Sequence, residues 1–206
     1  MEDYYEDLWE RLPEQLAPPD FERRRQYLLE EVRPGERVLD LGCGTGELTA
    51  ALALAGAQPI GVEVARAALR RARAGHPGLD FRLAPIGGAL PLADGSLDLV
   101  WSSEVIEHVA DTAAWLSEIW RVLVPRGRVL LTTPAHGRVP VAVWGLERYT
   151  QPLGDHLHLY TRRSLRTVLQ VLGFEEVCVR GVGGAPLCRR ILLARAVRPD
   201  PYARPR

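Results

Sequence analysis

The segment VLDLGCGTGELT, residues 38–49, holds the residues most suited to binding a ligand. An apolar run ends at Leu41, and three alternating glycines follow at Gly42, Gly44 and Gly46 before a helical pattern begins. Glycines at such a turn permit positive φ angles and let a ligand approach the backbone closely. A plain strand-to-helix turn has no need of three alternating glycines. The pattern therefore predicts a ligand-binding loop.

The spacing of these glycines indicates the kind of ligand. A dinucleotide loop has the pattern G-x-G-x-x-G and holds a pyrophosphate. Here the third glycine comes one residue early, and Glu47 stands where that pattern has glycine. Glu63 ends the apolar run GVE, and an acid there can accept hydrogen bonds from two ribose hydroxyls. The loop and Glu63 together predict a site for a nucleoside without phosphates. The alternative for Glu63 is an exposed carboxylate at a strand end.

The segment 135–160 is the place to look for a general base, which a reaction needs only if its substrate must lose a proton. His136 lies near its start, and His156, His158 and Tyr160 alternate near its end. An H-x-H pair could also bind a metal, but no third ligand is fixed by spacing, so we expect no metal. The alternative, in which His156 only holds the loop in place by hydrogen bonds, stays open.

The elements that must position these residues alternate along the chain. Helical patterns at about Glu47–Ala55, Arg66–Ala74 and Thr112–Leu123 separate apolar runs typical of strands at Arg37–Leu41, Gln58–Val62, Leu79–Leu83, Leu97–Trp101 and Arg128–Thr133. Such alternation predicts a parallel sheet with helices on both faces.

The C-terminal part breaks this alternation. A helical pattern at about Arg163–Leu172 ends at Gly173, and the strand-like runs Glu175–Arg180 and Arg189–Val197 follow with only GVGGAPLC between them. A linker this short cannot hold a crossover helix, so the two strands should pair antiparallel.

Two segments lie outside this pattern. Residues 1–33 predict a cap of one or two helices that carries Tyr4 and Tyr5, and residues 135–160 predict a lid-like loop that includes Trp144. Both could close over the carboxyl ends of the strands and give an apolar cover to a small, aromatic or lipid-like substrate. Ordinary packing against the core is the alternative for these aromatic residues. We expect one domain over residues 1–197 and a frayed tail at 198–206.

Composition limits the function classes. Basic and acidic residues both number 26, so the net charge of zero argues against a protein that depends on binding nucleic-acid phosphates. Three scattered cysteines indicate neither a zinc cluster nor a disulfide framework. The acidic N-terminus lacks the order of a signal peptide, and no apolar run is long enough to span a membrane. We therefore expect a cytoplasmic protein with a small-molecule substrate; the oligomeric state cannot be predicted.

Four segments carry a resemblance to a known family. VLDLGCGTG, the GVE strand end, LPLADGSLDLVWSSEVIEHVAD and DHLHLYTRRSLRTVLQVLGFEEV resemble class I S-adenosylmethionine-dependent methyltransferases, in the broad family that includes quinone-biosynthesis methyltransferases. The resemblance covers roughly residues 35–180. It implies a Rossmann-like doubly wound α/β sheet, mostly parallel with an antiparallel C-terminal strand. It also implies S-adenosyl-L-methionine as cofactor and S-adenosyl-L-homocysteine as product, and it says little about the acceptor.

The resemblance also implies roles for individual residues. Asp40 and the backbone from Gly42 through Cys43 to Gly44 would hold the methionine part of the cofactor, and Glu63 its ribose. Further contacts would come from Val64 against the adenine, and from Ser102 and Ser103 on the methionine and methyl-donor side. His108 would also touch the cofactor. Glu107 would only cap a helix.

His156 matches the histidine of the family's H-x-x-x-[FY]-[ST] pattern and is the candidate base. We expect its loss to lower turnover more than cofactor affinity. One departure concerns the adenine, because many relatives have an acid just after the third strand. This chain has Pro85, Ile86 and Gly87 there, so we expect backbone groups near Ile86 and Gly87 to recognise the adenine.

The expected function is methyl transfer to a small, apolar or aromatic acceptor. Two alternatives remain. One is a protein that binds the cofactor without catalysis, which the sequence cannot exclude because methyl transfer needs few side chains. The other is a nicotinamide-dependent oxidoreductase, which the early third glycine and the terminal antiparallel strands disfavour.

Overall fold

The computed structural model describes residues 2–13, 18–85, 87–137, 141–142, 156–186 and 188–202. Ile86, Trp144 and most of the segment 135–160 lie outside the described residues. The strands are β1 (Arg37–Leu41), β2 (Gln58–Glu63), β3 (Asp80–Leu83), β4 (Leu97–Ser103), β5 (Leu123–Pro134), β6 (Glu175–Val182) and β7 (Ile191–Val197). The helices are α1 (Glu2–Arg11), α2 (Phe21–Glu31), α3 (Glu47–Leu54), α4 (Arg66–Gly75), the 3₁₀ turn η1 (Ile106–His108), α5 (Thr112–Val122) and α8 (Arg162–Val171).

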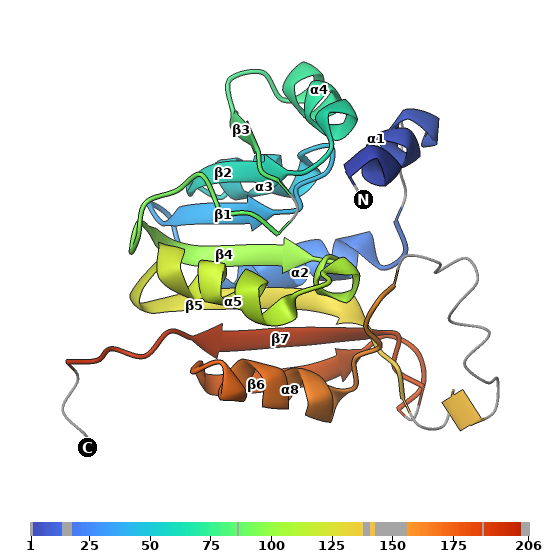
Figure 1. The fold of residues 1–206 in the computed structure, drawn as a ribbon, viewed down its shortest axis with the longest axis vertical. Coiled ribbons are helices and arrows are strands. Elements are labelled where there is room, and N and C mark those ends of the chain that lie inside the picture. The colour runs from blue at the N-terminus through green and yellow to red at the C-terminus, as the bar shows by residue number, and fades with distance from the viewer. Residues whose placement is uncertain are drawn as a thin grey trace.

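The strands form one seven-stranded sheet in the order β3-β2-β1-β4-β5-β7-β6 (Figure 1). The first five strands pair parallel, whereas β7 pairs antiparallel with both β5 and β6. This confirms the predicted doubly wound sheet and its antiparallel C-terminal strands. The strand order reverses at β1, which lies between β2 and β4 with Asp40 opposite Gly61 on one side and Trp101 on the other.

Hydrophobic side chains cover both faces of the sheet. On β1, Leu39 and Leu41 pack in one cluster with residues of α5 and α8, and Val38 packs in another with residues of α2 and α3. Successive side chains of a strand point to opposite faces, so an unbroken apolar run such as VLDL is buried on both sides. α5 and α8 lie in front of the sheet in Figure 1, and α2 and α3 lie behind it.

Local sequence explains where the helices begin and end. The Asp111 side chain accepts a hydrogen bond from the Ala114 N–H at the start of α5, at 2.9 Å. Thr161 and Ser164 form a reciprocal capping box at the start of α8. Gly173 follows α8 with a φ of 86°, as the sequence predicted for a glycine cap.

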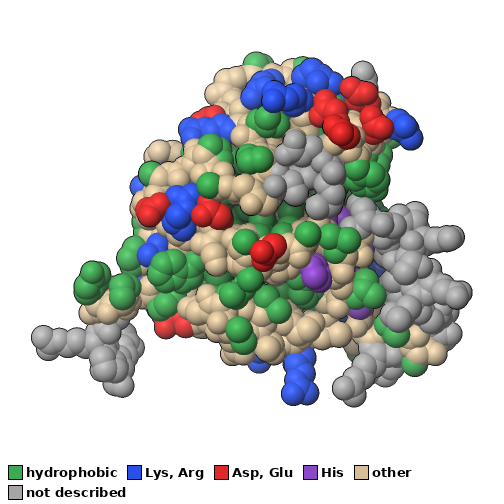
Figure 2. Space-filling view, viewed as in Figure 1, with side chains coloured by type: hydrophobic (Ala, Val, Ile, Leu, Met, Phe, Trp, Pro, Cys, Tyr) green, Lys and Arg blue, Asp and Glu red, His purple; other side chains and the backbone are tan. Residues whose placement is uncertain are grey.

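The N-terminal segment forms the two helices α1 and α2. Figure 2 shows acidic and basic side chains together at the top of the molecule, over α1 and α4. There, Arg70 of α4 pairs with Glu6 at 3.2 Å and Glu10 at 3.4 Å, and Glu6 also accepts a hydrogen bond from the Ala67 N–H. These contacts hold α1 beyond the carboxyl ends of the strands (Figure 1).

The first residue of the predicted tail, Arg198, contacts the rest of the fold. Arg198 is anchored to the fold, because its guanidinium lies 3.7 Å from the centre of the Trp120 ring and donates to the Trp120 carbonyl. Its backbone N–H also donates to the Gly127 carbonyl.

The helices in the described part of the chain include none with the length and apolar character of a membrane span.

Candidate functional site

A cavity of about 1450 Å³ opens where the parallel strands end, beside the reversal of strand order at β1. This is the place where open α/β sheets bind their ligands. Its wall comes from α1, α2, the loops after β1 to β4 and the start of α5. Of the predicted site residues, the cavity is lined by Tyr5, Asp40, Gly42, Cys43, Gly44, Glu63, Val64, Gly87, Ser103 and His108.

The glycine loop forms the floor of the cavity. The N–H groups of Gly42 and Cys43 both donate to the Val62 carbonyl, at 2.8 and 3.1 Å, which ties the loop to the end of β2. Gly42 has a φ of 81°, and a Cβ added there would lie 2.4 Å from a methyl group of Val105. Only glycine fits this close approach.

Glu63 is 7% exposed at the tip of β2. One carboxylate oxygen accepts from the N–H groups of Val64 and Ala65, and the other from the N–H of Gly44 at 3.1 Å. Burial raises the pKa of Glu63, and these three hydrogen bonds oppose the rise. An ionised carboxylate has about four acceptor positions. One position therefore stays open to a ribose hydroxyl, and a second hydroxyl would have to displace a backbone donor.

Asp40, on β1, is 2% exposed and accepts a hydrogen bond from the Thr49 hydroxyl at 2.6 Å. Burial raises the pKa of Asp40 to about 7, and the nearby charges of Glu63 and Glu47 add to this rise. A cationic group in the cavity would favour the ionised form of this carboxyl.

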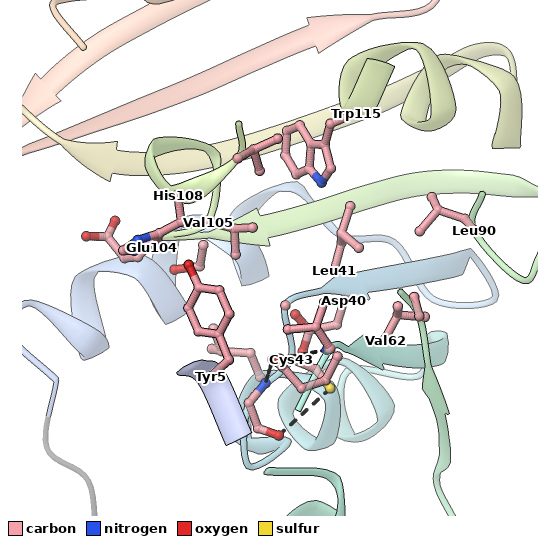
Figure 3. A pocket seen from close by; sticks show the side chains of 18 of the residues that line it. Tyr5, Asp40, Leu41, Cys43, Val62, Leu90, Glu104, Val105, His108 and Trp115 are labelled. Carbon is pink, nitrogen blue, oxygen red and sulfur yellow. Dashed lines mark hydrogen bonds between the residues drawn. The ribbon is translucent and has the colours of Figure 1, made fainter. Parts of the chain in front are cut away.

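The side of the cavity away from the glycine loop is mainly apolar and aromatic. Figure 3 shows Trp115 of α5, Val105 and Tyr5 of α1 around the space that faces Asp40 and Cys43. Trp9 of α1 lies against the glycine loop, with its ring 3.0 Å from the position of a Cβ at Gly44. The cavity therefore combines a polar end, at the glycine loop and Glu63, with a mainly apolar side on which Glu104 and His108 lie beside Tyr5 and Val105.

Several charged residues that the sequence did not indicate also line the cavity, and Arg24 and Glu104 are two of them. Arg24 of α2 is 6% exposed, and its guanidinium donates to the Ser103 hydroxyl at 3.1 Å. Glu104 follows β4 with a φ of 57° and accepts from the Thr132 hydroxyl at 2.8 Å. Arg24 and Ser103 are 79 residues apart in the chain, so no local spacing could have found this pair.

Two predicted cofactor residues do not line the cavity. Ser102 is buried, and its hydroxyl donates to the Leu41 carbonyl at 2.7 Å instead of facing the cavity. Gly46 faces Phe81 and His76. Cys43 does line the cavity, but its side chain packs with Leu69, Ala72 and Phe81, and burial raises the pKa of its thiol. Side-chain direction decided the outcome for Ser102 and Cys43, and the course of the backbone decided it for Gly46; loop spacing shows neither.

Of the predicted cap and lid residues that the structure describes, Tyr5 lines the cavity, and Tyr4, His136, His158 and Tyr160 do not. His136 is buried just after β5, where its backbone N–H donates to the Tyr160 carbonyl. Burial lowers the pKa of its imidazole ring. Tyr160 is buried with its hydroxyl 3.3 Å from that of Thr112, and the His158 ring lies 6.0 Å from the Tyr160 ring. Tyr4, which is half exposed, packs edge-on against Tyr5.

His156 does not line the cavity but lies against a residue that does. Its ring centre is 4.6 Å from that of His108, at an interplanar angle of 83°, and His108 is the member of this pair that lines the cavity. Glu107, next to His108, is fully buried and accepts from the Thr133 hydroxyl at 2.9 Å. The fold thus gathers two histidines and a carboxylate from two distant segments.

A comparison with protein families identifies a match over residues 8–179 to the family described as "Methyltransferase domain". The chain is 39% identical over 166 residues to a demethylmenaquinone methyltransferase of Beutenbergia cavernae, covering 73% of this chain and 68% of that protein. It is 34% identical over 148 residues to a protein of Mycolicibacterium smegmatis named "Probable S-adenosylmethionine-dependent methyltransferase", covering 72% of this chain and 55% of that protein.

Solved structures share the fold at lower identity. An S-adenosylmethionine-dependent methyltransferase from Mesorhizobium loti superposes with a TM-score of 0.71 at 21% identity, covering 88% of this chain and 99% of that one. The chain spans about half or less of the length of several curated relatives that it matches, from 28% to 55%.

Proposed function

The chain belongs to the methyltransferase domain family, and we propose that it transfers the methyl group of S-adenosylmethionine to a small, apolar or aromatic acceptor. The observation that carries the proposal is the division of one cavity into two chemically different ends. Glu63 and the glycine loop form one end, and Tyr5, Val105 and Trp115 form the other.

The polar end suits a nucleoside joined to an amino acid. Glu63 has an acceptor position for a ribose hydroxyl, and Val64 and Gly87 offer an apolar surface and a backbone for the adenine. Asp40 provides a carboxyl near the glycine loop for the cationic sulfonium and ammonium groups. Glu47, which also lines the cavity, would repel a pyrophosphate, and this disfavours a dinucleotide.

The size of the cavity supports a second ligand. Small-molecule sites have volumes of roughly 300–1000 Å³. The cavity here, at about 1450 Å³, exceeds that range and so has room for a cofactor and an acceptor together. Because the side of the cavity beyond the glycine loop is lined mainly by aromatic and aliphatic side chains, an apolar or aromatic acceptor is the best fit.

The chemistry asks little of individual side chains. Methyl transfer forms a bond from the acceptor atom to the methyl carbon and breaks the bond from carbon to sulfur, whose electron pair stays on the sulfur. The cofactor supplies the leaving group, so the protein mainly aligns the acceptor and excludes water. α1, with Tyr5 and Trp9 on the cavity wall, is placed to exclude water.

Thermal unfolding with added ligands tests the cofactor. A ligand at about 100 times its dissociation constant adds roughly 2.7 kcal/mol to the folded state. For a chain of this size the midpoint should rise by roughly 5–10 °C. We expect a rise with S-adenosylmethionine and S-adenosylhomocysteine and none with NAD or NADP. A rise with NAD or NADP alone would overturn our interpretation of the glycine loop.

A pair of variants locates the binding site. Glu63→Gln should abolish the rise, because an amide NH₂ replaces one of the oxygens that accept from the backbone and the ribose. The control is Glu30→Gln on the exposed side of α2, whose carboxylate pairs with Arg180 at 3.7 Å. An equal rise in both variants would refute the role of Glu63.

Turnover tests the acceptor class and separates an enzyme from a protein that only binds the cofactor. We expect S-adenosylhomocysteine to form with at least one member of a panel of quinols, phenols and small carboxylic acids. Product only with polar or nucleic-acid acceptors would contradict the acceptor class. Cofactor binding without product from any acceptor would contradict catalysis.

A further inference from the structure

Three side chains able to bind a metal converge at the wall of the cavity, and one of them, His108, lines it. Ligand atoms of Glu107, His108 and His156 all lie within 4.8 Å of one another. The first two belong to η1 and the third lies 48 residues further on. The sequence offered His156 and His158 as a pair without a third ligand. The cluster leaves His158 out and joins His156 to two residues of η1.

Backbone hydrogen bonds hold the two segments together. The N–H groups of Leu157 and His158 both donate to the Glu107 carbonyl, at 2.8 and 3.0 Å. The segment after His156 is therefore fixed against η1 independently of any side-chain contact. The approach of His156 to His108 is a consequence of this pairing, and the two rings meet nearly at right angles with their centres 4.6 Å apart.

Glu107 is oriented toward the two histidines. It is fully buried, and one carboxylate oxygen accepts from the Thr133 hydroxyl at 2.9 Å. The other oxygen lies 3.9 Å from His108 Nε2. Metal-binding carboxylates are commonly oriented by such a hydrogen bond to the oxygen that does not bind the ion.

We propose that Glu107, His108 and His156 bind a divalent transition-metal cation, with zinc as the best fit. Imidazole ligands favour zinc and its neighbours over magnesium or calcium, which prefer oxygen ligands alone. Two histidines and one glutamate, with a fourth position open, are a known ligand set for zinc in enzymes. Zinc bonds of about 2.0–2.2 Å would place the ligand atoms about 3.4 Å apart. The ligand atoms must therefore draw closer when the ion binds, and the histidine rings, which are only partly buried, can rotate to do so.

The site lies beside the cavity, so a bound ion could take part in the reaction. That part of the proposal rests on the proposed function, whereas the binding of the ion does not. His108 lines the cavity, and Figure 3 shows it beside Glu104 at the end toward which the Tyr5 hydroxyl points. An open coordination position on that side would take an oxygen atom of the acceptor. As a metal ligand, His156 would act through this site and not as the general base.

Metal titration of the full chain tests the site without reference to activity. After removal of metals with a chelator, the protein is titrated with Zn²⁺ by calorimetry and with Co²⁺ by visible absorption. We expect one ion per chain, and Co²⁺ bands of a low-coordinate site. His156→Ala should weaken Zn²⁺ binding by about 100-fold or more, since loss of even a supporting contact costs 10–100-fold. The control His158→Ala removes a neighbouring imidazole outside the cluster and should bind as the wild type does.

Two further measurements keep the outcomes separate. If His156→Ala does not fold, as judged by circular dichroism, His108→Gln replaces it as the test. Equal Zn²⁺ affinity in the wild type and a folded ligand variant, or no binding at one ion per chain, would overturn the metal site. The shift of the unfolding midpoint with S-adenosylmethionine is recorded on the metal-free protein, so failure of the metal site and failure of the proposed function are distinguishable.

Discussion

Replacing Asp40 by asparagine should change how the stability of the protein depends on pH. Asp40 is 2% exposed, and burial is the main reason that its pKa rises to about 7. Asparagine has the same shape and keeps an oxygen to accept from the Thr49 hydroxyl, but it does not titrate. The comparison of Asp40→Asn with the wild type therefore isolates one buried titrating group.

The sign and size of the effect follow from the raised pKa. Between about pH 4 and pH 7 the folded protein keeps the proton on Asp40 while the unfolded chain has lost it. The free energy of unfolding therefore falls by about 1.4 kcal/mol per pH unit across this window. Over about three units the total is about 4 kcal/mol, a ceiling because water entry and relaxation reduce the cost of a buried charge. Asp40→Asn should lack this decline and be the more stable protein at pH 8.

Urea unfolding followed by circular dichroism at pH 4.5, 5.5, 6.5 and 8 measures the difference. The other buried carboxyls with raised pKa values, Glu63 and Glu104, are present in both proteins, so their contributions largely cancel. Curves that stay parallel from pH 4.5 to pH 8 would refute the raised pKa. The gain in stability should come with a loss of affinity for S-adenosylmethionine, because an ionised carboxyl no longer faces its positive charges.

Three further predictions concern the cavity and the core. Gly42→Ala should abolish the thermal shift with S-adenosylmethionine, since its Cβ would lie 2.4 Å from a methyl group of Val105; Gly78→Ala, whose φ is also positive but whose surroundings are open, should cost only about 1–2 kcal/mol of strain and keep the shift. Trp9→Ala should weaken cofactor binding in calorimetry while leaving the unfolding midpoint of the unliganded protein within a few degrees; unchanged affinity would contradict a role for α1 in covering the cofactor. Arg128→Ala should lower the free energy of unfolding by about 3–5 kcal/mol in urea, because it leaves the largely buried Glu36 carboxylate without its partner at 2.8 Å; a loss below 1 kcal/mol would contradict this.

The strands and helices of the sheet were predictable because their signals are local. Each of the apolar runs predicted as parallel strands forms a strand, with the largest difference at β5, which begins at Leu123 and not at Arg128. The short GVGGAPLC linker required the antiparallel pairing of β6 and β7, because no crossover fits in it. The start of α8 was predicted one residue late, where the Thr161 capping box sets the boundary.

The direction of individual side chains was not predictable in the same way. Ser102 and Ser103 are neighbours in sequence at the end of β4, yet Ser102 bonds to the Leu41 carbonyl while Ser103 faces the cavity and Arg24. Successive residues of a strand point to opposite faces, so the register of the sheet decides which of the two meets a ligand. Arg24 reaches the cavity because α2 packs behind the sheet, which no short motif encodes.

The sequence by itself determined the family, the glycine loop and the position of the acid at Glu63, because each depends on residues close together in the chain. Glycine at Gly42 is required by the backbone, and the carboxyl end of β2 places Glu63 opposite the loop. Only the tertiary structure decided which residues share the cavity, and only it brought His156 to Glu107 and His108. His108 and His156 are 48 residues apart, and they meet because η1 and the segment from His156 to Tyr160 pack against each other and against β5. The packing of distant segments leaves no spacing pattern in the sequence.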